Sequence, residues 1–398
     1  MSSSHVLIVA GEASGDMHGA NLVRALRSQR PGIKISAMGG SALAAECELI
    51  YDSSRLAVVG LVEVLGHLGG ILAARRRLID FLKEQRPDLL ILIDYPDFNL
   101  LLAAQAKKLG IRVLYYISPQ VWAWRRGRVA KIKRLVDRMA VILPFEQEFY
   151  RRQGLAVDFV GHPLVDELAP LVAQRTVLPV DEQQGGNGQA SLKAAAGLGV
   201  EDEGRPVIGL VPGSRRREVA ALLPVFLAAA DRLAKKLEQP PIFLLPMAPG
   251  LRHATLQEHG LERYPELDIR VSRQDRHRTM AACDAAMAAS GTVTLELAIL
   301  GVPTVAAYRV STFTYLVGRL LVKVPYVTLV NLVAKREVIP ELIQHQAEPA
   351  TISREIVELL TNQSRRRAML QDLAEVRQKL GGGGASQKAA ELALSLLN

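Results

Sequence analysis

A glycine and serine turn followed by three arginines is the first feature of this chain that suits a charged ligand. Residues 207–218 read Val-Ile-Gly-Leu-Val-Pro-Gly-Ser-Arg-Arg-Arg-Glu. The apolar run predicts a buried strand, and Ser214 is the expected N-cap of a following helix. Gly213 lets a ligand approach the backbone, the first helical N–H groups favour anions, and Arg215 adds a cation. This pattern predicts a phosphate or diphosphate site, and the alternative is a solvated basic face on a surface helix.

A second turn of small residues follows a later apolar run. Residues 288–292 read Ala-Ala-Ser-Gly-Thr, so Ser290, Gly291 and Thr292 offer hydroxyl groups and amides at a helix start. Glu296 lies one helical turn further, and a carboxylate has two oxygens for the two hydroxyl groups of a ribose. Together, the two turns and Glu296 predict a site for a nucleoside diphosphate.

Asp94 is the candidate general base. It is the first charged residue after the five apolar residues 89–93. A carboxylate at the end of a buried strand is partly desolvated, and desolvation raises its pKa towards the range that suits a base. The alternative is a turn-forming residue beside Pro96, and Asp97 fits a helix cap.

These side chains require a scaffold of parallel strands. Short apolar runs alternate with helical patterns in both halves of the chain, which predicts two α/β domains of the Rossmann-like type. Such sheets bind ligands at the carboxyl ends of their strands. Residues 173–205 contain a Gln- and Gly-rich stretch and are expected to form a linker or an exposed insertion. The expected domain limits are 1–170, 171–365 and 366–398.

Composition narrows the possible partners. The 398 residues carry a net charge of +9, which suits phosphorylated ligands, anionic membranes or nucleic acid. The two cysteines, Cys47 and Cys283, give neither a disulfide framework nor a zinc set and fit a reducing cytoplasm. We expect neither a signal peptide nor a membrane-spanning helix. The chain lacks a P-loop, a G-x-G-x-x-G turn and an Asp-x-Asp after a strand, so we expect no cofactor and no metal.

Several motifs resemble those of the lipid-A-disaccharide synthase family. They are Gly-Glu-Ala-Ser-Gly-Asp at 11–16, Ile-Asp-Tyr-Pro-Asp-Phe-Asn at 93–99, Tyr-Ile-Ser-Pro-Gln-Val-Trp-Ala-Trp at 116–124, Leu-Pro-Phe-Glu at 143–146, Pro-Gly-Ser-Arg at 212–215, Ser-Gly-Thr at 290–292 with Glu296, and Asn-Leu at 331–332. The similarity runs from about His5 to Glu341, and residues 118–124 are its most specific part. The sequence departs from the pattern near 183–199 and at 381–384, which leaves the motifs intact.

The resemblance implies a two-domain glycosyltransferase of the GT-B type. Residues 1–170 would bind the lipid acceptor, residues 171–365 would bind the UDP-sugar donor, and the C-terminal helix would return to the first domain. UDP-2,3-diacylglucosamine and 2,3-diacylglucosamine 1-phosphate would give the β-1,6-linked disaccharide 1-phosphate and UDP. The alternatives are another UDP-sugar enzyme, such as a UDP-N-acetylglucosamine epimerase, or a basic nucleic-acid-binding protein. We rank the nucleic-acid-binding protein last and expect no nucleic acid partner.

The expected catalytic residues are Asp94, which takes the proton of the acceptor hydroxyl, and Arg215, which stabilises the departing UDP. The resemblance also places Asn331 at a functional position. The residues expected to bind the substrates are Glu12, Ser14, Gly15, Asp16, Gly213, Ser214, Ser290, Gly291, Thr292, Glu296 and Asn331.

A helix expected over 61–85 is a candidate membrane contact. Its apolar side chains at helical spacing are Leu61, Val64, Leu65, Leu68, Ile71 and Leu72, and Arg75–Arg77 follow them. That pattern is typical of an interfacial helix. The resemblance implies acylated substrates, and with them a cytoplasmic protein that is peripheral on the inner face of the inner membrane. The alternative is an ordinary core helix. Trp122 and Trp124 likewise fit either a lipid-contacting patch or the core. The oligomeric state is not predicted.

Overall fold

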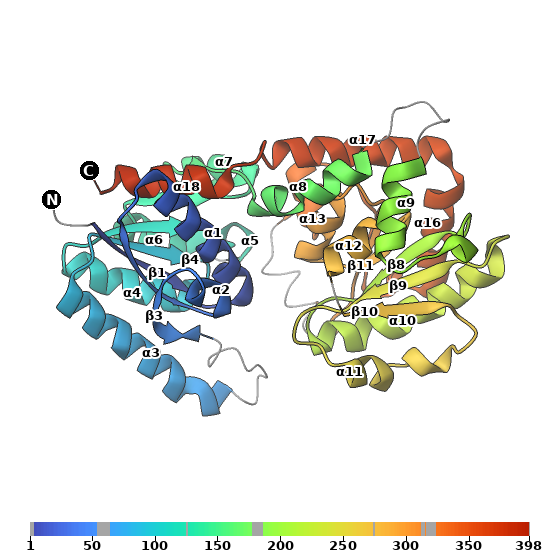
Figure 1. Cartoon of the computed structure of the whole chain (residues 1–398), viewed down its shortest axis with the longest axis horizontal. Helices are drawn as coiled ribbons and strands as arrows, with labels where there is room; N and C mark the ends of the chain where they lie inside the picture. Colours follow the sequence, from blue (N-terminus) through green and yellow to red (C-terminus); the bar gives the residue numbers. More distant parts are fainter. Residues whose placement is uncertain are drawn as a thin grey trace. The chain divides into compact units, whose positions relative to one another are not determined.

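The computed structural model describes residues 4–53, 64–124, 126–176, 186–273, 275–311, 315 and 324–397. The chain forms two compact units, the first from Met1–Pro163 with Gly381–Asn398 and the second from Leu164–Leu380 (Figure 1). These limits lie near residues 163 and 380, whereas the sequence analysis placed the domain limits at 170 and 365.

The first unit contains a seven-stranded parallel sheet in the order β3-β2-β1-β4-β5-β6-β7. Its strands are β1 (His5–Ala10), β2 (Lys34–Gly39), β3 (Glu48–Asp52), β4 (Leu89–Ile93), β5 (Arg112–Tyr116), β6 (Arg138–Val141) and β7 (Asp158–Phe159). Its helices are α1 (Ala13–Gln29), α2 (Ser41–Ala44), α3 (Val64–Gln85), α4 (Pro96–Lys108), α5 (Val121–Trp124), α6 (Val129–Leu135), α7 (Pro144–Arg152) and α18 (Ala385–Ser395). The order reverses between β1 and β4, which is where doubly wound sheets bind ligands.

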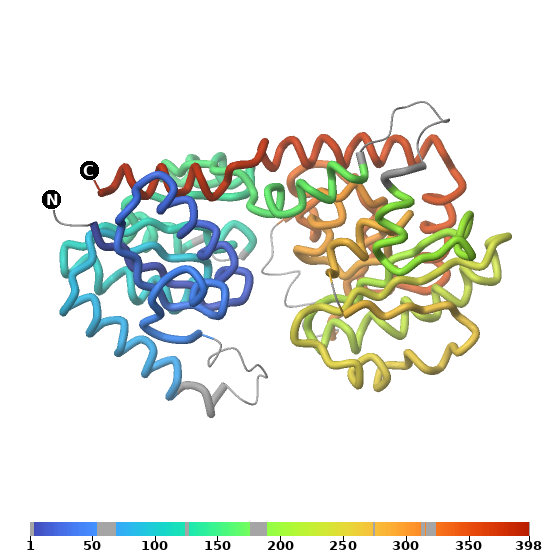
Figure 2. The backbone as a smooth tube through the Cα atoms, viewed as in Figure 1, coloured from blue at the N-terminus to red at the C-terminus, as the bar shows by residue number. Residues whose placement is uncertain are grey.

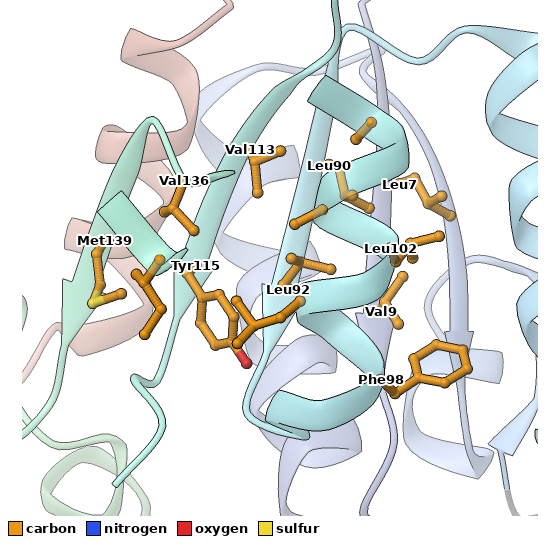
Figure 3. Close-up of a cluster of buried hydrophobic side chains, with 14 of the residues drawn as sticks. Leu7, Val9, Leu90, Leu92, Phe98, Leu102, Val113, Tyr115, Val136 and Met139 are labelled. Atoms are coloured by element: carbon orange, nitrogen blue, oxygen red, sulfur yellow. The ribbon is translucent and has the colours of Figure 1, made fainter. Parts of the chain in front are cut away.

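Apolar side chains cover both faces of this sheet. On one face, Leu90 and Leu92 of β4 lie beside Leu102 of α4 in a buried cluster (Figure 3). On the other face, Ala389 and Ala393 of α18 join a cluster with α1. Small residues allow two helices to approach closely, and Figure 2 shows the red C-terminal segment beside the blue α1. The expected return of the C-terminal helix to the first unit is therefore confirmed.

The second unit repeats the arrangement with a six-stranded parallel sheet in the order β10-β9-β8-β11-β12-β13. Its strands are β8 (Val207–Val211), β9 (Ile242–Pro246), β10 (Ile269–Ser272), β11 (Ala285–Ala289), β12 (Thr304–Tyr308) and β13 (Glu341–Ile343). Its helices are α8 (Pro163–Thr176), α9 (Gly186–Ala195), α10 (Arg216–Lys236), α11 (His253–Glu258), α12 (Arg276–Ala281), α13 (Thr292–Ile299), α15 (Leu329–Ala334), α16 (Pro349–Thr361) and α17 (Gln363–Lys379). Here the strand order reverses between β8 and β11.

The Gln- and Gly-rich stretch is partly a docked helix, so the expectation of a linker or exposed insertion was wrong for residues 186–195. Gln189 and Lys193 of α9 bind the Asp284 carboxylate at 2.7 and 3.0 Å, and Leu192 is fully buried. A carboxylate with two donors on one helix face fixes that helix to the unit. Residues 177–185 lie outside the described part of the chain.

Helix α3 has a buried face and an exposed residue at its amino-terminal half. Ala74, Leu78 and Leu82 are fully buried, and Ile71 packs against the same cluster, whereas Leu72 is 58% exposed. The side chains of Val64, Leu65 and Leu68, and residue Leu61, lie outside the described part. Among the described helices, none is long and apolar enough to cross a membrane.

Candidate active site

Asp94 follows β4 directly and has a left-handed backbone. Its φ is 44°, and that of Tyr95 is 46°, a conformation that costs a non-glycine residue about 1–3 kcal/mol. Asn99 Nδ2 offsets this cost by donating to the carbonyl oxygens of Ile93 and Asp94 at 3.2 and 2.7 Å. Tyr115 Oη also donates to the Asp94 carbonyl oxygen at 2.6 Å. The turn that presents Asp94 is therefore held by side chains from α4 and β5.

The Asp94 carboxyl group has an unusually high proton affinity. Burial, and then the negative charge of Glu12, raise its pKa from 3.8 to about 6, although a hydrogen bond from the Tyr95 backbone opposes the shift. A carboxylate with this pKa is still ionised at neutral pH and is a stronger base than an ordinary aspartate. The structure therefore agrees with the expected desolvation of Asp94.

The first unit brings the loop after β1 next to the loop after β4. Ala10 pairs with Ile93 in the sheet, so Gly11 and Asp94 begin neighbouring loops. A side chain at Gly11 would collide with Tyr95, because a Cβ atom there would lie 2.4 Å from Cδ1 of that ring. Helix α1 begins at Ala13, so the second half of the motif at 11–16 forms its first turn.

The residues of this first turn have different surroundings. Glu12 and Ser14 are exposed, whereas Gly15 and Asp16 are buried. The Asp16 carboxylate accepts hydrogen bonds from the backbone N–H groups of Gly40 (2.7 Å), Ala42 (2.9 Å) and Leu43 (3.0 Å). Asp16 thus anchors the start of α2, and substrate contacts of Glu12–Asp16 stay a prediction.

A buried carboxyl group joins the loops after β5 and β6, beside the Asp94 loop. Glu146 Oε1 accepts hydrogen bonds from Ser118 Oγ (2.6 Å) and Trp122 Nε1 (3.2 Å), and Glu146 Oε2 accepts one from the Leu143 N–H group (3.0 Å). Burial raises its pKa to about 7 even though these bonds favour the charged form. Trp122 is therefore a core residue, and the side chain of Trp124 lies outside the described part.

This network was not predicted, although residues 118–124 and 143–146 both stood out as motifs. The contact joins positions far apart in the chain, and the spacing of the two motifs contains no sign of it.

In the second unit, the turn after β8 is occupied by a side chain of the protein. Gly213 has a φ of 110°, and α10 has Arg215 as its N-cap, one residue later than the expected Ser214. Glu218 Oε2 accepts hydrogen bonds from the N–H groups of Ser214 (3.0 Å) and Arg215 (3.2 Å). Arg215 Nη1 lies 3.2 Å from Glu218 Oε1, and the arginine side chain is 79% exposed. The N–H groups expected to be free at this turn therefore already have a partner.

The turn after β11 lies next to this one, because Val211 pairs with Ala288 in the sheet. Ser290 and Gly291 precede α13, which begins at Thr292 as expected. Ser290 and Gly291 therefore lie at the carboxyl ends of the strands, as Pro212 does.

Glu296 is buried on α13 and faces two side chains of α12 that the sequence analysis missed. It forms an ion pair with Arg276, and His277 Nε2 lies 3.5 Å from its carboxylate. Burial alone would raise the pKa of Glu296, but the neighbouring His277 and Arg276 more than offset burial and lower it. Arg276 and His277 follow β10, and their place after a predicted strand is the signal that could have identified them. Ribose binding by Glu296 stays a prediction.

Asn331 is a buried anchor. Its Nδ2 donates to the Ile339 carbonyl oxygen and to Glu341 Oε1, both at 2.9 Å. Its Oδ1 accepts from the N–H groups of Val338 (2.8 Å) and Ile339 (3.1 Å). These four bonds use the full capacity of an amide side chain, so Asn331 holds residues 338–341 here. Its contact with substrate stays a prediction.

Among the described residues, no group of three or more His, Cys, Asp or Glu side chains is arranged to hold a metal ion.

Comparison with known proteins decides the family. A family model described as lipid-A-disaccharide synthetase matches residues 6–396. The chain belongs to the lipid-A-disaccharide synthetase family. It is 48% identical to a lipid-A-disaccharide synthase of Trichlorobacter lovleyi over 98% of this chain and 97% of that relative.

Solved structures share the fold of this lipid-A-disaccharide synthetase family member at low sequence identity. A UDP-GlcNAc 2-epimerase from Neisseria meningitidis, solved with UDP-GlcNAc bound, has a TM-score of 0.67 and 13% identity over 98% of this chain and all of its own. A glycosyltransferase of kitacinnamycin has a TM-score of 0.65 and 14% identity over the full length of both chains. The expected GT-B fold with two Rossmann-like units is confirmed. At these identities, the likeness concerns the fold alone.

Proposed function

We propose that this protein transfers a 2,3-diacylglucosaminyl group from UDP to 2,3-diacylglucosamine 1-phosphate, which yields the β-1,6-linked lipid A disaccharide 1-phosphate and UDP. The observation that carries the proposal is membership of the lipid-A-disaccharide synthetase family over nearly the whole chain. The family also makes the protein a glycosyltransferase. An epimerase shares the fold, but its likeness to this chain is limited to 13% identity.

In the proposed mechanism, Asp94 acts on the acceptor. As the acceptor 6-oxygen attacks the anomeric carbon of the donor, its proton passes to the Asp94 carboxylate. The new carbon–oxygen bond forms as the bond to UDP breaks, and the configuration inverts in a single displacement. The raised pKa of Asp94 supports this role, because a base is most effective when its pKa lies near the working pH.

The second unit would bind the departing UDP. The turn at Pro212–Arg215 follows β8, and the start of α13 follows β11. These are the two neighbouring strands between which the strand order reverses. Arg215 and the helix N-termini would stabilise the negative charge that develops on the diphosphate. Glu296 would take the ribose, which requires Arg276 to share or leave that carboxylate.

We further propose a peripheral position at the inner face of the inner membrane. Both substrates of the proposed reaction carry acyl chains, so the enzyme must meet them at a lipid surface. The exposed Leu72 and the exposed Arg76 and Arg77 on α3 support contact with an anionic bilayer.

The decisive test is product analysis with purified protein. Incubation with both acylated substrates should release UDP together with a disaccharide of the expected mass. Incubation with UDP-N-acetylglucosamine alone should leave that sugar unchanged. Epimerised sugar in the second reaction, without disaccharide in the first, would favour the epimerase alternative.

A further inference from the structure

The Glu218 carboxylate lies against the backbone of the turn after β8. Its Oε2 accepts two backbone N–H groups, those of Ser214 and Arg215, and its Oε1 faces the Arg215 guanidinium at 3.2 Å. A Cβ atom at Gly213 would lie 2.4 Å from the same Oε2 atom. The carboxylate therefore lies so close to residue 213 that any side chain there would collide with it, and glycine avoids this collision.

This set of partners is the one that a phosphate group needs. Phosphate oxygens bind at helix N-termini through two or more N–H groups and pair well with an arginine fork. Glu218, an anion of the protein itself, already accepts the two N–H groups and pairs with one nitrogen of the Arg215 guanidinium. Because an N–H group has one hydrogen to donate, a phosphate and the Glu218 carboxylate cannot both take the same two amides at full strength.

We propose that Glu218 is a built-in competitor for the donor diphosphate, which occupies the Ser214 and Arg215 amides in the free enzyme and leaves them when UDP binds. The inference rests on the proposed function in one respect, since that function places the diphosphate of UDP at this turn. It goes further in assigning a role to Glu218.

The exchange has a consequence for product release. After transfer, the diphosphate of UDP can be displaced step by step, as the Glu218 carboxylate returns first to Arg215 and then to the two amides. The turn is then never left without an anion. The helix start keeps its cap and Arg215 keeps an acidic partner throughout the cycle.

The experiment is titration of the full-length protein with UDP by calorimetry at fixed pH and ionic strength. Glu218→Gln keeps the reach of the side chain and can still cap the helix, but it removes the charge. Glu218→Asp keeps the charge on a side chain that is one methylene shorter, which withdraws it from the Ser214 amide. Both variants should bind UDP about three- to tenfold more tightly than the wild type.

Glu258→Gln is the matched control. Glu258 of α11 pairs with the adjacent Arg216 at 3.2 Å, so this change removes one negative charge near the same helix start without touching the amides. Its UDP affinity should stay at the wild-type value. Thermal unfolding of each variant verifies that the fold is retained.

Each other outcome overturns the inference. Unchanged or weaker UDP binding in Glu218→Gln would show that the carboxylate is a permanent cap or orients Arg215 for the ligand. A gain in Glu258→Gln equal to that in Glu218→Gln would reduce the effect to net charge. A wild-type protein that does not bind UDP would contradict the proposed function itself, and this titration detects that case without any acylated substrate.

Discussion

At the scale of single residues, the sequence predicts the burial of Asp94 but not the backbone conformation that presents it. Its position after an apolar strand predicts a partly desolvated carboxylate, and the raised pKa agrees. The left-handed backbone at Asp94 and Tyr95 has no sequence signature beyond the tolerance of aspartate for that conformation. This backbone conformation is held by hydrogen bonds from Asn99 and Tyr115 to the Asp94 carbonyl oxygen, and these bonds form only when the unit is folded.

Replacing Asp94 with asparagine should abolish the base without disturbing the turn. Asparagine also tolerates a positive φ, and it has nearly the same size. We expect turnover to fall about a hundredfold or more, with UDP affinity unchanged in calorimetry. Asp97→Asn is the control, because Asp97 lies nearby in the first turn of α4 and pairs with Arg128 at the surface. Equal turnover in both variants would remove Asp94 from the mechanism.

The pH dependence of the rate should report the same group. The base works only when deprotonated, so the rate should rise with pH through about 6 and level off above it. The charge of Glu12 contributes to the raised pKa, and Glu12→Gln should therefore move the acid limb to lower pH. Glu12→Asp keeps the charge and should leave the limb near its wild-type place. A limb that does not move in Glu12→Gln would show that burial alone sets the pKa.

Asp16, Glu218 and Asn331 show what a sequence pattern leaves open about a polar side chain. Asp16 and Asn331 were expected to bind substrate, and Glu218 lies one turn after Ser214, yet each has polar atoms bonded to the protein's own groups. For Asp16, the partners lie on another loop, around Gly40. A sequence pattern identifies an acceptor or donor, but only the fold shows whether the protein or a ligand fills it.

At the scale of elements, the described part of α3 supports the core interpretation for one face, and the membrane interpretation stays a prediction. Its described part is core on one face, through Ala74, Leu78 and Leu82, yet it exposes Leu72. Periodicity alone could not separate these cases, since a membrane face and a core face have the same spacing.

Leu72→Ser and Leu78→Ser should therefore affect different properties: vesicle binding and unfolding free energy, respectively. Leu78→Ser opens a cavity in the core and should cost about 2–5 kcal/mol of unfolding free energy, which thermal unfolding detects. Leu72→Ser should keep the melting temperature and weaken binding to anionic vesicles in a flotation assay. If Leu72→Ser floats with vesicles as well as the wild type does, α3 is not the membrane contact through this residue.

The strands were predictable because buried parallel strands are short, continuous apolar runs, as in Leu89–Ile93 and Val207–Val211. The limits of the helices were less predictable from the sequence. The N-cap of α10 moves to Arg215 because Glu218 reaches back to the preceding amides. Helix α9 was missed since its glycines, and the glutamines just before it, are typical of a linker, and its docking to Asp284 involves a residue far along the chain.

At the scale of the whole molecule, two parallel sheets share the same order over six strands, and most of the candidate residues follow the strands where that order reverses. Alternating strands and helices predicted this architecture. The expected return of residues 366–398 to the first unit depended instead on the family resemblance, because α18 carries mostly small apolar residues that would suit many partners. Residues 381–398 belong to the first unit, whereas α17 belongs to the second.

A charge on the buried face of α18 should therefore damage the first unit selectively. Ala389→Asp places a carboxylate in the cluster shared with α1 and should cost about 3 kcal/mol or more. Gln387→Asp adds the same charge at an exposed position of α18 and should have little effect. Hydrogen–deuterium exchange should increase in α1 for Ala389→Asp, while β8 and β11 keep their protection. Equal exchange in both variants would mean that α18 does not support α1.

The division of the first unit between the two ends of the sequence also determines the order in which a ribosome can complete the protein. All residues of the second unit are synthesised before α18 is made. At ordinary elongation rates, those intervening residues take roughly 10–40 s. Throughout this time, α1 lacks the helix that packs against it in the complete unit, and we expect the nascent first unit to bind chaperones. The usual order of domain completion is reversed in this chain: the second unit is finished first, and the first unit closes last.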